Sequence, residues 1–305
     1  MNSLREVGVL FVKAGVNKVN RPIIKMLVLS VFGGFFIGLS AAFSSLLDYN
    51  LLEGYTQFYK GMVFPLGIII VYCAGGELIT GNFLLTIAFF ATKIKILEML
   101  LSWLIVFVGN FIGCILISVL IIYSHLPNMF NVNLARIVIL TGNEKCGLNF
   151  GEAFIKAMLG NFFNCLGLWL AMIGKDMRSV LLGLFIPNFL LMALGLNHCV
   201  ADMYYILAGL FTSYEYGLDS TEMSWGKLFY KSIIPDLLGN AIGGGILIGV
   251  MYWYLFLNRE AGEHRAKKNK IKVNNNINKF IENNKSTNTN QNQNPDFSSL
   301  KMLDN

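Results

Sequence analysis

Charged residues are scarce in this sequence, and that scarcity excludes a large class of proteins. Of 305 residues only 14% are charged, whereas an ordinary soluble domain carries about 25%. Hydrophobic residues make up 55% of the chain, and the mean hydropathy is +0.57. This composition is typical of a membrane protein and excludes a water-soluble globular fold. The formal net charge of +6 comes largely from segments that flank apolar runs, so it indicates membrane topology rather than a nucleic-acid partner.

Cysteine and histidine are also few, with five and three copies. The cysteines are odd in number and all but Cys146 lie in or beside apolar runs, which excludes a disulfide scaffold and predicts small core residues. The sequence contains no Walker loop, no Cys/His cluster at metal-ligand spacing, no haem signature and no catalytic Ser or Cys constellation. We therefore expect no cofactor, no metal and no enzymatic activity.

Long apolar runs, by contrast, are abundant. A membrane-spanning helix needs roughly 20 apolar residues, and four uninterrupted runs satisfy this requirement: 26–47, 96–123, 154–173 and 233–257. Two further runs are interrupted: 61–91 at residues 73–82, and 180–212 at residues 195–202. Each half is too short to span a membrane alone, but the two halves together are long enough. The sequence therefore predicts an all-α membrane protein with six transmembrane helices within residues 23–258, the second and fifth broken.

The flanking charges predict how these helices are oriented. Lys and Arg concentrate in segments predicted on one side, whereas the opposite loops are mixed in charge. Six passes then place both termini on the positive, cytoplasmic side of a plasma or inner membrane. Residues 1–22 predict an amphipathic cytoplasmic helix, which either lies at the membrane interface or simply leads into the first span. Residues 259–305 are basic and then Asn-rich, which predicts a disordered cytoplasmic tail.

The two halves of the chain resemble each other. A break at 75–82 is followed by a helix carrying Gly109-Asn110, and a break at 195–202 is followed by a helix carrying Gly239-Asn240. Three passes per half is an odd number, so the halves must lie in the membrane with opposite orientation. An inverted repeat with paired broken helices places a transport site near the midplane, where unwound backbone lines a cavity.

Polar residues inside the predicted spans are the candidates for function, because such residues are expensive in a membrane. His198, in the second break, could hold or lend a proton beside an anion, or could be a neutral residue that only fixes the break. Thr80, in the matching break, could face His198 or satisfy a nearby carbonyl. Asn161 and Asn164 share one face of the fourth span, as interhelical contacts or as pore lining. Lys145 lies in the outer loop before that span and is, on sequence alone, an ordinary loop lysine.

Two acidic residues also fall in the breaks. Glu77 and Asp202 would repel an anion, so we expect them to lie against the exposed N–H groups of the half-helices that resume there. That role is structural. His198 remains the one side chain of the second break expected to titrate near neutral pH.

At these residues the chain resembles the formate/nitrite transporter family. The resemblance rests on four stretches that agree in order and spacing: 76–82 (GELITGN), 159–161 (LGN), 197–204 (NHCVADMY) and 235–240 (PDLLGN). It covers the predicted spans in register, from about residue 26 to residue 257. The resemblance implies a homo-pentamer of aquaporin-like protomers in membrane lipid, each passing protons and small monovalent anions such as formate, nitrite, hydrosulfide, acetate or lactate.

The resemblance also implies roles for individual residues. The His of the family's second break is the central pore residue and the Thr of the first break faces it, here His198 and Thr80. The Asn of the fourth helix and the Lys of the preceding loop complete the polar set, here Asn161 and Lys145, and Asn197 belongs to the same pathway. The implied apolar constrictions lie on the two sides of the His: Phe64 and Leu191 on one, Leu78 on the other.

The chain departs from the family pattern at four positions near the breaks. Asn197 precedes the His where many members have Glu, and Asp202 stands where Asn is common. Ile79 and Leu191 replace expected Phe residues. These changes bear on substrate choice more than on the fold.

The predicted function is a channel for weak-acid anions or an anion–proton symporter. An aquaporin-like pore for water or small neutral solutes is the alternative, although neither break contains an Asn-Pro-Ala motif. A membrane enzyme using His198 as a base would lack a second catalytic group at suitable spacing. A membrane scaffold acting through the Asn-rich tail is the remaining alternative, and deletion of residues 268–305 separates it from a transporter.

Overall fold

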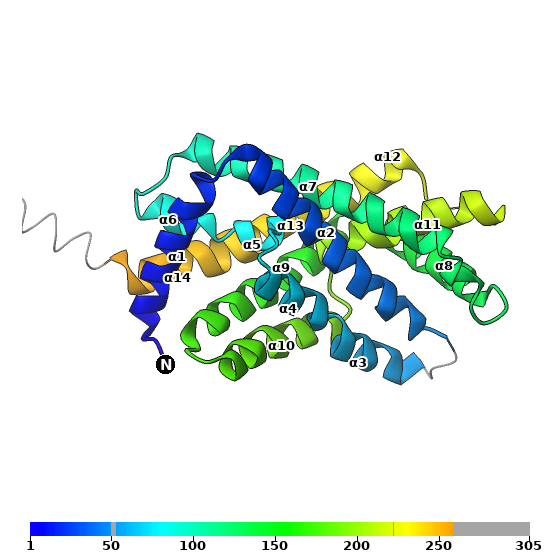
Figure 1. Cartoon of the computed structure of the whole chain (residues 1–305), viewed down its shortest axis with the longest axis horizontal. Coiled ribbons are helices and arrows are strands. Elements are labelled where there is room, and N and C mark those ends of the chain that lie inside the picture. The colour runs from blue at the N-terminus through cyan, green and yellow to red at the C-terminus, as the bar shows by residue number, and fades with distance from the viewer. Residues whose placement is uncertain (50–52, 222, 259–305) are drawn as a thin grey trace, which may run out of the picture. The chain divides into compact units, whose positions relative to one another are not determined.

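The computed structural model describes residues 1–49, 53–221 and 223–258, which are helical throughout apart from turns and short connections (Figure 1). In chain order the elements are α1 Leu4–Val19, α2 Ile23–Leu46, α3 Glu53–Val63, α4 Pro65–Ala74, α5 Ile79–Asn82, α6 Leu85–Phe90, α7 Ile96–Tyr123, η1 Leu126–Asn128, α8 Asn133–Gly147, α9 Phe150–Ile173, α10 Met177–Ala193, α11 Cys199–Tyr216, α12 Trp225–Lys227, η2 Leu228–Ile233, α13 Ile234–Asn240, η3 Ala241–Val250 and α14 Met251–Phe256. The predicted tail, residues 259–305, lies outside the described residues.

Five helical stretches of the described chain are long and apolar enough to cross a membrane: 23–46, 55–74, 96–123, 150–173 and 225–256. They match the four predicted continuous spans to within a few residues, except that the last begins eight residues earlier, at Trp225. The first half of the second span starts at Tyr55 rather than at Gly61, because α3 runs into α4. The fifth predicted pass is divided between α10, of 17 residues, and α11, of 18 residues.

The two breaks are shorter than predicted and share one backbone design. Gly75 and Gly195 end α4 and α10 with positive φ, +84° and +63°, a conformation that only glycine adopts without strain. The next N–H closes each turn, from Gly76 to the Val71 carbonyl at 2.8 Å and from Leu196 to the Leu191 carbonyl at 3.1 Å. Helical structure resumes as α5 at Ile79 and as α11 at Cys199.

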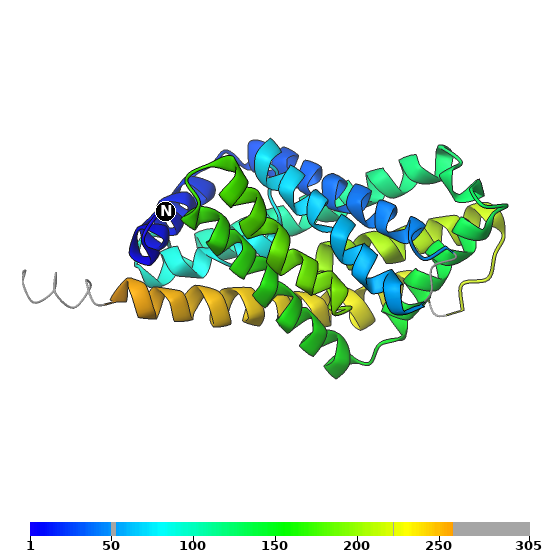
Figure 2. The same cartoon turned by 90° about the horizontal axis from the view of Figure 1, so that it is seen from below.

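Helix α1 packs on the rest of the chain. Ser3 caps it in a capping box with Glu6, and its apolar face buries Val7 and Phe11 against α6, α9 and α14. The ring of Phe11 stacks on Trp169 of α9, with centroids 5.4 Å apart. Protein contacts therefore cover one part of the apolar face of α1, while Leu4, Val9 and Leu10 stay exposed. Helices α1 and α14 lie together at one end of the helices (Figures 1 and 2).

Helix α8 corrects the sequence analysis, which placed Lys145 in a loop. The segment is too polar for a membrane span, but it buries Leu134, Val138 and Ile139 at helical spacing against α11. Lys145 belongs to the last turn of this helix. In Figures 1 and 2, α8 lies at the end opposite to α1.

Candidate transport site

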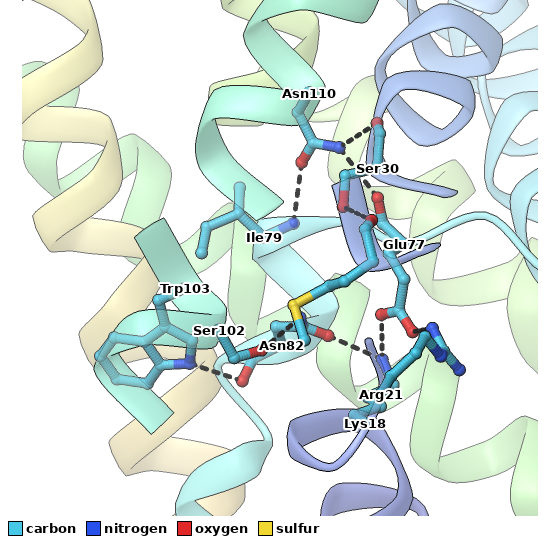
Figure 3. A network of polar contacts seen from close by, with 10 residues as sticks. Lys18, Arg21, Ser30, Glu77, Ile79, Asn82, Ser102, Trp103 and Asn110 are labelled. Atoms are coloured by element: carbon cyan, nitrogen blue, oxygen red, sulfur yellow. Dashed lines mark hydrogen bonds and ion pairs between the residues drawn. The ribbon is translucent and has the colours of Figure 1, made fainter. Parts of the chain in front are cut away.

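Two asparagines from neighbouring spans hold the unwound backbone of the breaks. Asn110 of α7 accepts the Ile79 N–H at 2.9 Å and donates to the carbonyls of Glu77 and Ser30, both at 2.8 Å (Figure 3). Asn240 of α13 repeats this contact in the second half, where it accepts the Cys199 N–H at 3.2 Å. These amides supply the partners that backbone groups require at membrane depth.

Two glycines let the spans approach the same backbone closely. A Cβ added to Gly33 of α2 would lie 2.1 Å from the Glu77 carbonyl oxygen, and one added to Gly160 of α9 would lie 2.1 Å from the Asn197 carbonyl oxygen. The backbone N–H of each of these break residues also donates to a carbonyl of the facing helix, one turn before the glycine. Glu77 donates to the carbonyl of residue 29 at 3.0 Å, and Asn197 donates to the carbonyl of residue 156 at 3.4 Å. Matched contacts of this kind show that the two halves repeat one structural plan.

His198 and Thr80 meet where the two breaks face each other. His198 is the N-cap of α11, and its Nδ1 accepts the Ala201 N–H at 3.3 Å. A neutral ring in this arrangement carries its proton on Nε2, which lies 3.2 Å from the Thr80 Oγ1 and donates to it. The two side chains are 2% and 0% exposed, so this polar pair is closed off from both sides of the protein.

Asn161 binds the backbone next to this pair. Its Nδ2 donates to the carbonyls of Thr80 at 3.1 Å and of Asn240 at 2.8 Å, while its Oδ1 accepts from Asn164 at 3.1 Å. Of the two alternatives left open by the sequence, the geometry favours interhelical contact for Asn161. Asn164, one turn on, lines a cavity.

Two cavities flank the pair, which itself lines neither. The α1 vestibule, about 240 Å³, is lined by Lys18 and Arg21 of α1, by residues 75–78 of the first break, and by Asn164 and Leu168 of α9. The α8 vestibule, about 370 Å³, is lined by Lys145 of α8, by Lys156 of α9, by residues 194–197 of the second break and by Tyr205 of α11.

Three apolar side chains named in the sequence analysis are buried in this part of the molecule. The ring of Phe64 meets the His198 ring edge-on, with centroids 5.6 Å apart, and both Phe64 and Leu191 are 0% exposed. Leu78 is buried and lines the α1 vestibule next to Thr80 in the first break. The three residues that the resemblance implies as constrictions are therefore all buried in this part of the molecule.

Two cations of α1 lie at the first break. Lys18 Nζ lies 2.7 Å from Glu77 Oε2 and 2.6 Å from Asn82 Oδ1, and Arg21 forms the second ion pair of Glu77 (Figure 3). The Glu77 side chain is 4% exposed. Our expectation that Glu77 lies against helix N–H groups is wrong, because two cations of α1 are closer partners.

The second break carries the opposite balance of charge. Lys145 Nζ lies 2.8 Å from Asp202 Oδ1 and 2.9 Å from the amide oxygen of Asn197. Asn197 Nδ2 in turn donates to Asp236 Oδ1 at 2.9 Å, and Ser232 donates to Asp236 Oδ2 at 2.9 Å. Asp202, like Glu77, pairs with a cation instead of capping its half-helix.

Sequence reasoning missed three charged residues of these networks. Lys18 and Arg21 were counted only as topology charges, and Asp236 only as part of a motif. The overlooked signal was an aspartate inside an apolar span, which is expensive unless it has partners.

The matched stretches, the paired breaks and the buried His–Thr contact can now be compared with known proteins. The family model for formate/nitrite transporters matches residues 5–254. The chain belongs to this family. The formate channel BtFdhC of Bacillus thuringiensis is 31% identical over 252 residues, which cover 81% of this chain and 93% of that protein. YrhG of Bacillus subtilis, an uncharacterized transporter, is 30% identical over 86% of this chain and 96% of its own length.

The fold of this formate/nitrite transporter also matches a solved structure. A pentameric formate channel with formate bound superimposes with a TM-score of 0.69 at 22% identity, over 77% of this chain and 98% of the other. The resemblance inferred from the sequence is thereby confirmed, together with the all-α membrane fold. The family is one of channels and transporters rather than enzymes.

Proposed function

We propose that this formate/nitrite transporter passes small monovalent weak-acid anions, formate first, together with a proton. The observation that carries the proposal is the buried His198–Thr80 pair between two vestibules, enclosed by Phe64, Leu78 and Leu191. A single polar centre within apolar walls suits a solute that enters the vestibule as an anion and crosses the apolar region as the neutral acid. The names of two relatives, formate channels of Bacillus thuringiensis and Escherichia coli, support formate as the first candidate.

The physical reason is the cost of moving a charge through an apolar constriction. A bare anion is heavily penalised there unless it is paired or neutralised. A weak acid avoids this penalty by taking up a proton before the constriction and releasing it beyond. His198 Nε2–H and the Thr80 hydroxyl then offer hydrogen bonds to the neutral acid where the two breaks meet.

We also propose a homo-pentamer with one pore per protomer and both termini on the cytoplasmic side. The pentameric formate channel to which the fold is similar supports the assembly. The positive flanking segments support the orientation. In that orientation the α1 vestibule opens to the cytoplasm, and the α8 vestibule opens to the outside.

Reconstitution of the full chain in liposomes tests the proposal. Uptake of formate, nitrite, hydrosulfide and lactate is compared across pH, with water permeability measured in the same vesicles. We expect formate uptake that increases as the outside is acidified. Water permeability without anion uptake would favour the neutral-solute pore instead.

Variants of His198 separate the two roles that the sequence left open. His198→Phe should abolish anion flux while the protein still assembles, because the pore loses its polar centre. His198→Asn keeps a hydrogen-bonding group that cannot titrate near neutral pH. Lost flux in the Asn variant indicates proton transfer by the imidazole, whereas retained flux with an unchanged pH profile indicates protonation from water. Normal transport by the Phe variant would show that the His is structural only.

A further inference from the structure

The second break buries more negative than positive charge. Asp202 is 1% exposed and Asp236 is 0% exposed. Lys145 forms an ion pair with Asp202 and donates a hydrogen bond to Asn197. Two buried carboxylates and one ammonium, which is 20% exposed, leave a net charge of −1 beside the α8 vestibule.

Neither oxygen of Asp202 accepts a hydrogen bond from the described residues. The two oxygens of Asp236 accept hydrogen bonds from Asn197 and Ser232, whereas Asp202 Oδ1 has only its ion pair with Lys145. Within the described residues, Asp202 Oδ2 receives no hydrogen bond, although it is fully buried. A buried carboxylate oxygen without a hydrogen-bond donor is costly, so Asp202 Oδ2 is a place where a proton or another cation can bind.

The ligand that fits is a proton. Lys145 already occupies the place of a cation between Asp202 and Asn197, and the described residues hold no cluster of three or more His, Cys, Asp or Glu side chains suited to a metal. Two like-charged carboxyl groups in one desolvated site readily share a proton.

The remaining titratable groups around the pair do not supply this charge. Cys199 lies near both carboxyl groups and Tyr205 lies near Asp202, and both side chains are neutral in their ordinary state at pH 7. His198, next to Asn197, is neutral in the arrangement described above. Lys156, which lines the vestibule from α9, forms its own ion pair with Glu152 at 2.8 Å. Lys60 likewise pairs with Asp48 at 2.7 Å.

We propose that Asp202 and Asp236 form a proton-binding site of the α8 vestibule, and that its occupancy decides whether Lys145 attracts an anion. With no proton bound, the excess negative charge repels an anion from the vestibule. With one proton bound the cluster is neutral, and with a second the charge of Lys145 is uncompensated. Flux should therefore rise as pH falls on the α8 side. The transport readout rests on the proposed function, whereas proton binding itself does not.

Flux measurements in proteoliposomes test the effect on anions. Asp236→Asn keeps the shape of the side chain and removes one charge, so formate flux at alkaline pH on the α8 side should rise about tenfold over wild type. Its dependence on the pH of that side should become shallower, and Asp202→Asn should act in the same direction. Asp219→Asn, the same change at an exposed position just beyond α11, should follow the wild type at every pH. Asn variants that assemble and keep the wild-type pH profile would overturn the proposal.

Infrared difference spectroscopy between acidic and alkaline pH tests proton binding without any flux. Full-length protein in lipid should show a protonated-carboxyl band that Asp202→Asn and Asp236→Asn each diminish and Asp219→Asn leaves unchanged. If no variant transports any anion, the proposed function fails, but this band still supports the proton site. A band that the two Asn variants leave unchanged overturns it. A band that responds to sodium instead of pH also overturns it, in favour of an alkali cation.

Discussion

The first and the second helix break have the same backbone contacts and opposite charge. In both, a glycine with positive φ ends the first half-helix, and an asparagine from a later span accepts an N–H of the next one. Glu77 and Asn197 occupy matching positions, each with its carbonyl against a glycine of the facing helix. Around Glu77 lie two cations, whereas around Asn197 lie two carboxylates and one lysine.

The shared backbone contacts and the opposite charges show which part of the site the fold requires. Backbone groups at membrane depth must be satisfied in both halves, so the glycines and asparagines that satisfy them recur. Side-chain charges carry no such requirement, and each half can adjust them to the solution that its own vestibule faces. The predictions that follow test this division, from the largest expected effect to the smallest.

Adding one methyl group at the close contacts should damage both halves equally. Gly33→Ala and Gly160→Ala place a Cβ 2.1 Å from a carbonyl oxygen of the break. We expect each to cost at least about 3 kcal/mol, because backbone on both sides prevents relaxation. The measurement is the yield and thermal stability of purified protein. Gly147→Ala, where a Cβ meets nothing within 4 Å, is the control. A stable protein from only one of the two variants would contradict the symmetry.

Removing the asparagine amides should destabilise the protein slightly more in the first half than in the second. Asn110 makes three hydrogen bonds to backbone, whereas two are recorded for the side chain of Asn240, to Cys199 and Ala157. Asn110→Ala should therefore lower the free energy of unfolding by about 3 kcal/mol and Asn240→Ala by about 2 kcal/mol. Thermal unfolding in one detergent compares them. The reverse order would show that the count of bonds does not determine the loss.

Neutralising the acid of the first break should leave the fold in place. Glu77→Gln leaves Lys18 and Arg21 without their carboxylate, and we expect a loss of about 1–2 kcal/mol, since these cations are 31% and 25% exposed and solvent screens them. Lys18→Met should cost less, because Arg21 still pairs with Glu77. Unfolding temperatures at low and high salt provide the measurement. A larger loss of stability for Lys18→Met than for Glu77→Gln would show that Lys18 stabilises the break chiefly through its hydrogen bond to Asn82.

The N-terminus of helix α1 should show a small dependence on pH. Hydrogen bonds from the Ser3 N–H and hydroxyl lower the pKa of the Glu6 carboxyl below its ordinary value of 4.5. A lowered folded-state pKa stabilises above pH 4.5, and this support is lost as pH falls through the lowered value. Amide hydrogen exchange in α1 should therefore accelerate only in acid, and Glu6→Gln should remove the effect. Equal acceleration in that variant would assign it to another group.

Much of the architecture could be predicted from the sequence because the dominant signals are local. Apolar runs and glycine-rich interruptions predicted the spans and both breaks, and the repeated Gly-Asn pairs predicted the inverted halves. The partners of charged residues could not be predicted in this way. Lys18 and Glu77 are 59 residues apart, and no local pattern encodes their contact. Helix α8 was missed because its apolar face is too short and too interrupted by charge to resemble a span.

The asparagine contacts have a consequence for the order in which the protein is made. Asn110 is synthesised 31 residues after the Ile79 N–H that it accepts, and Asn240 follows Cys199 by 41 residues. Asn161, which donates to the Thr80 carbonyl, is synthesised 81 residues after Thr80. Until those residues leave the ribosome, each break exposes backbone groups that lipid cannot satisfy. The nascent chain must therefore keep each broken helix in a wet or protein-lined environment at the insertion machinery, and release it only after the next span has arrived.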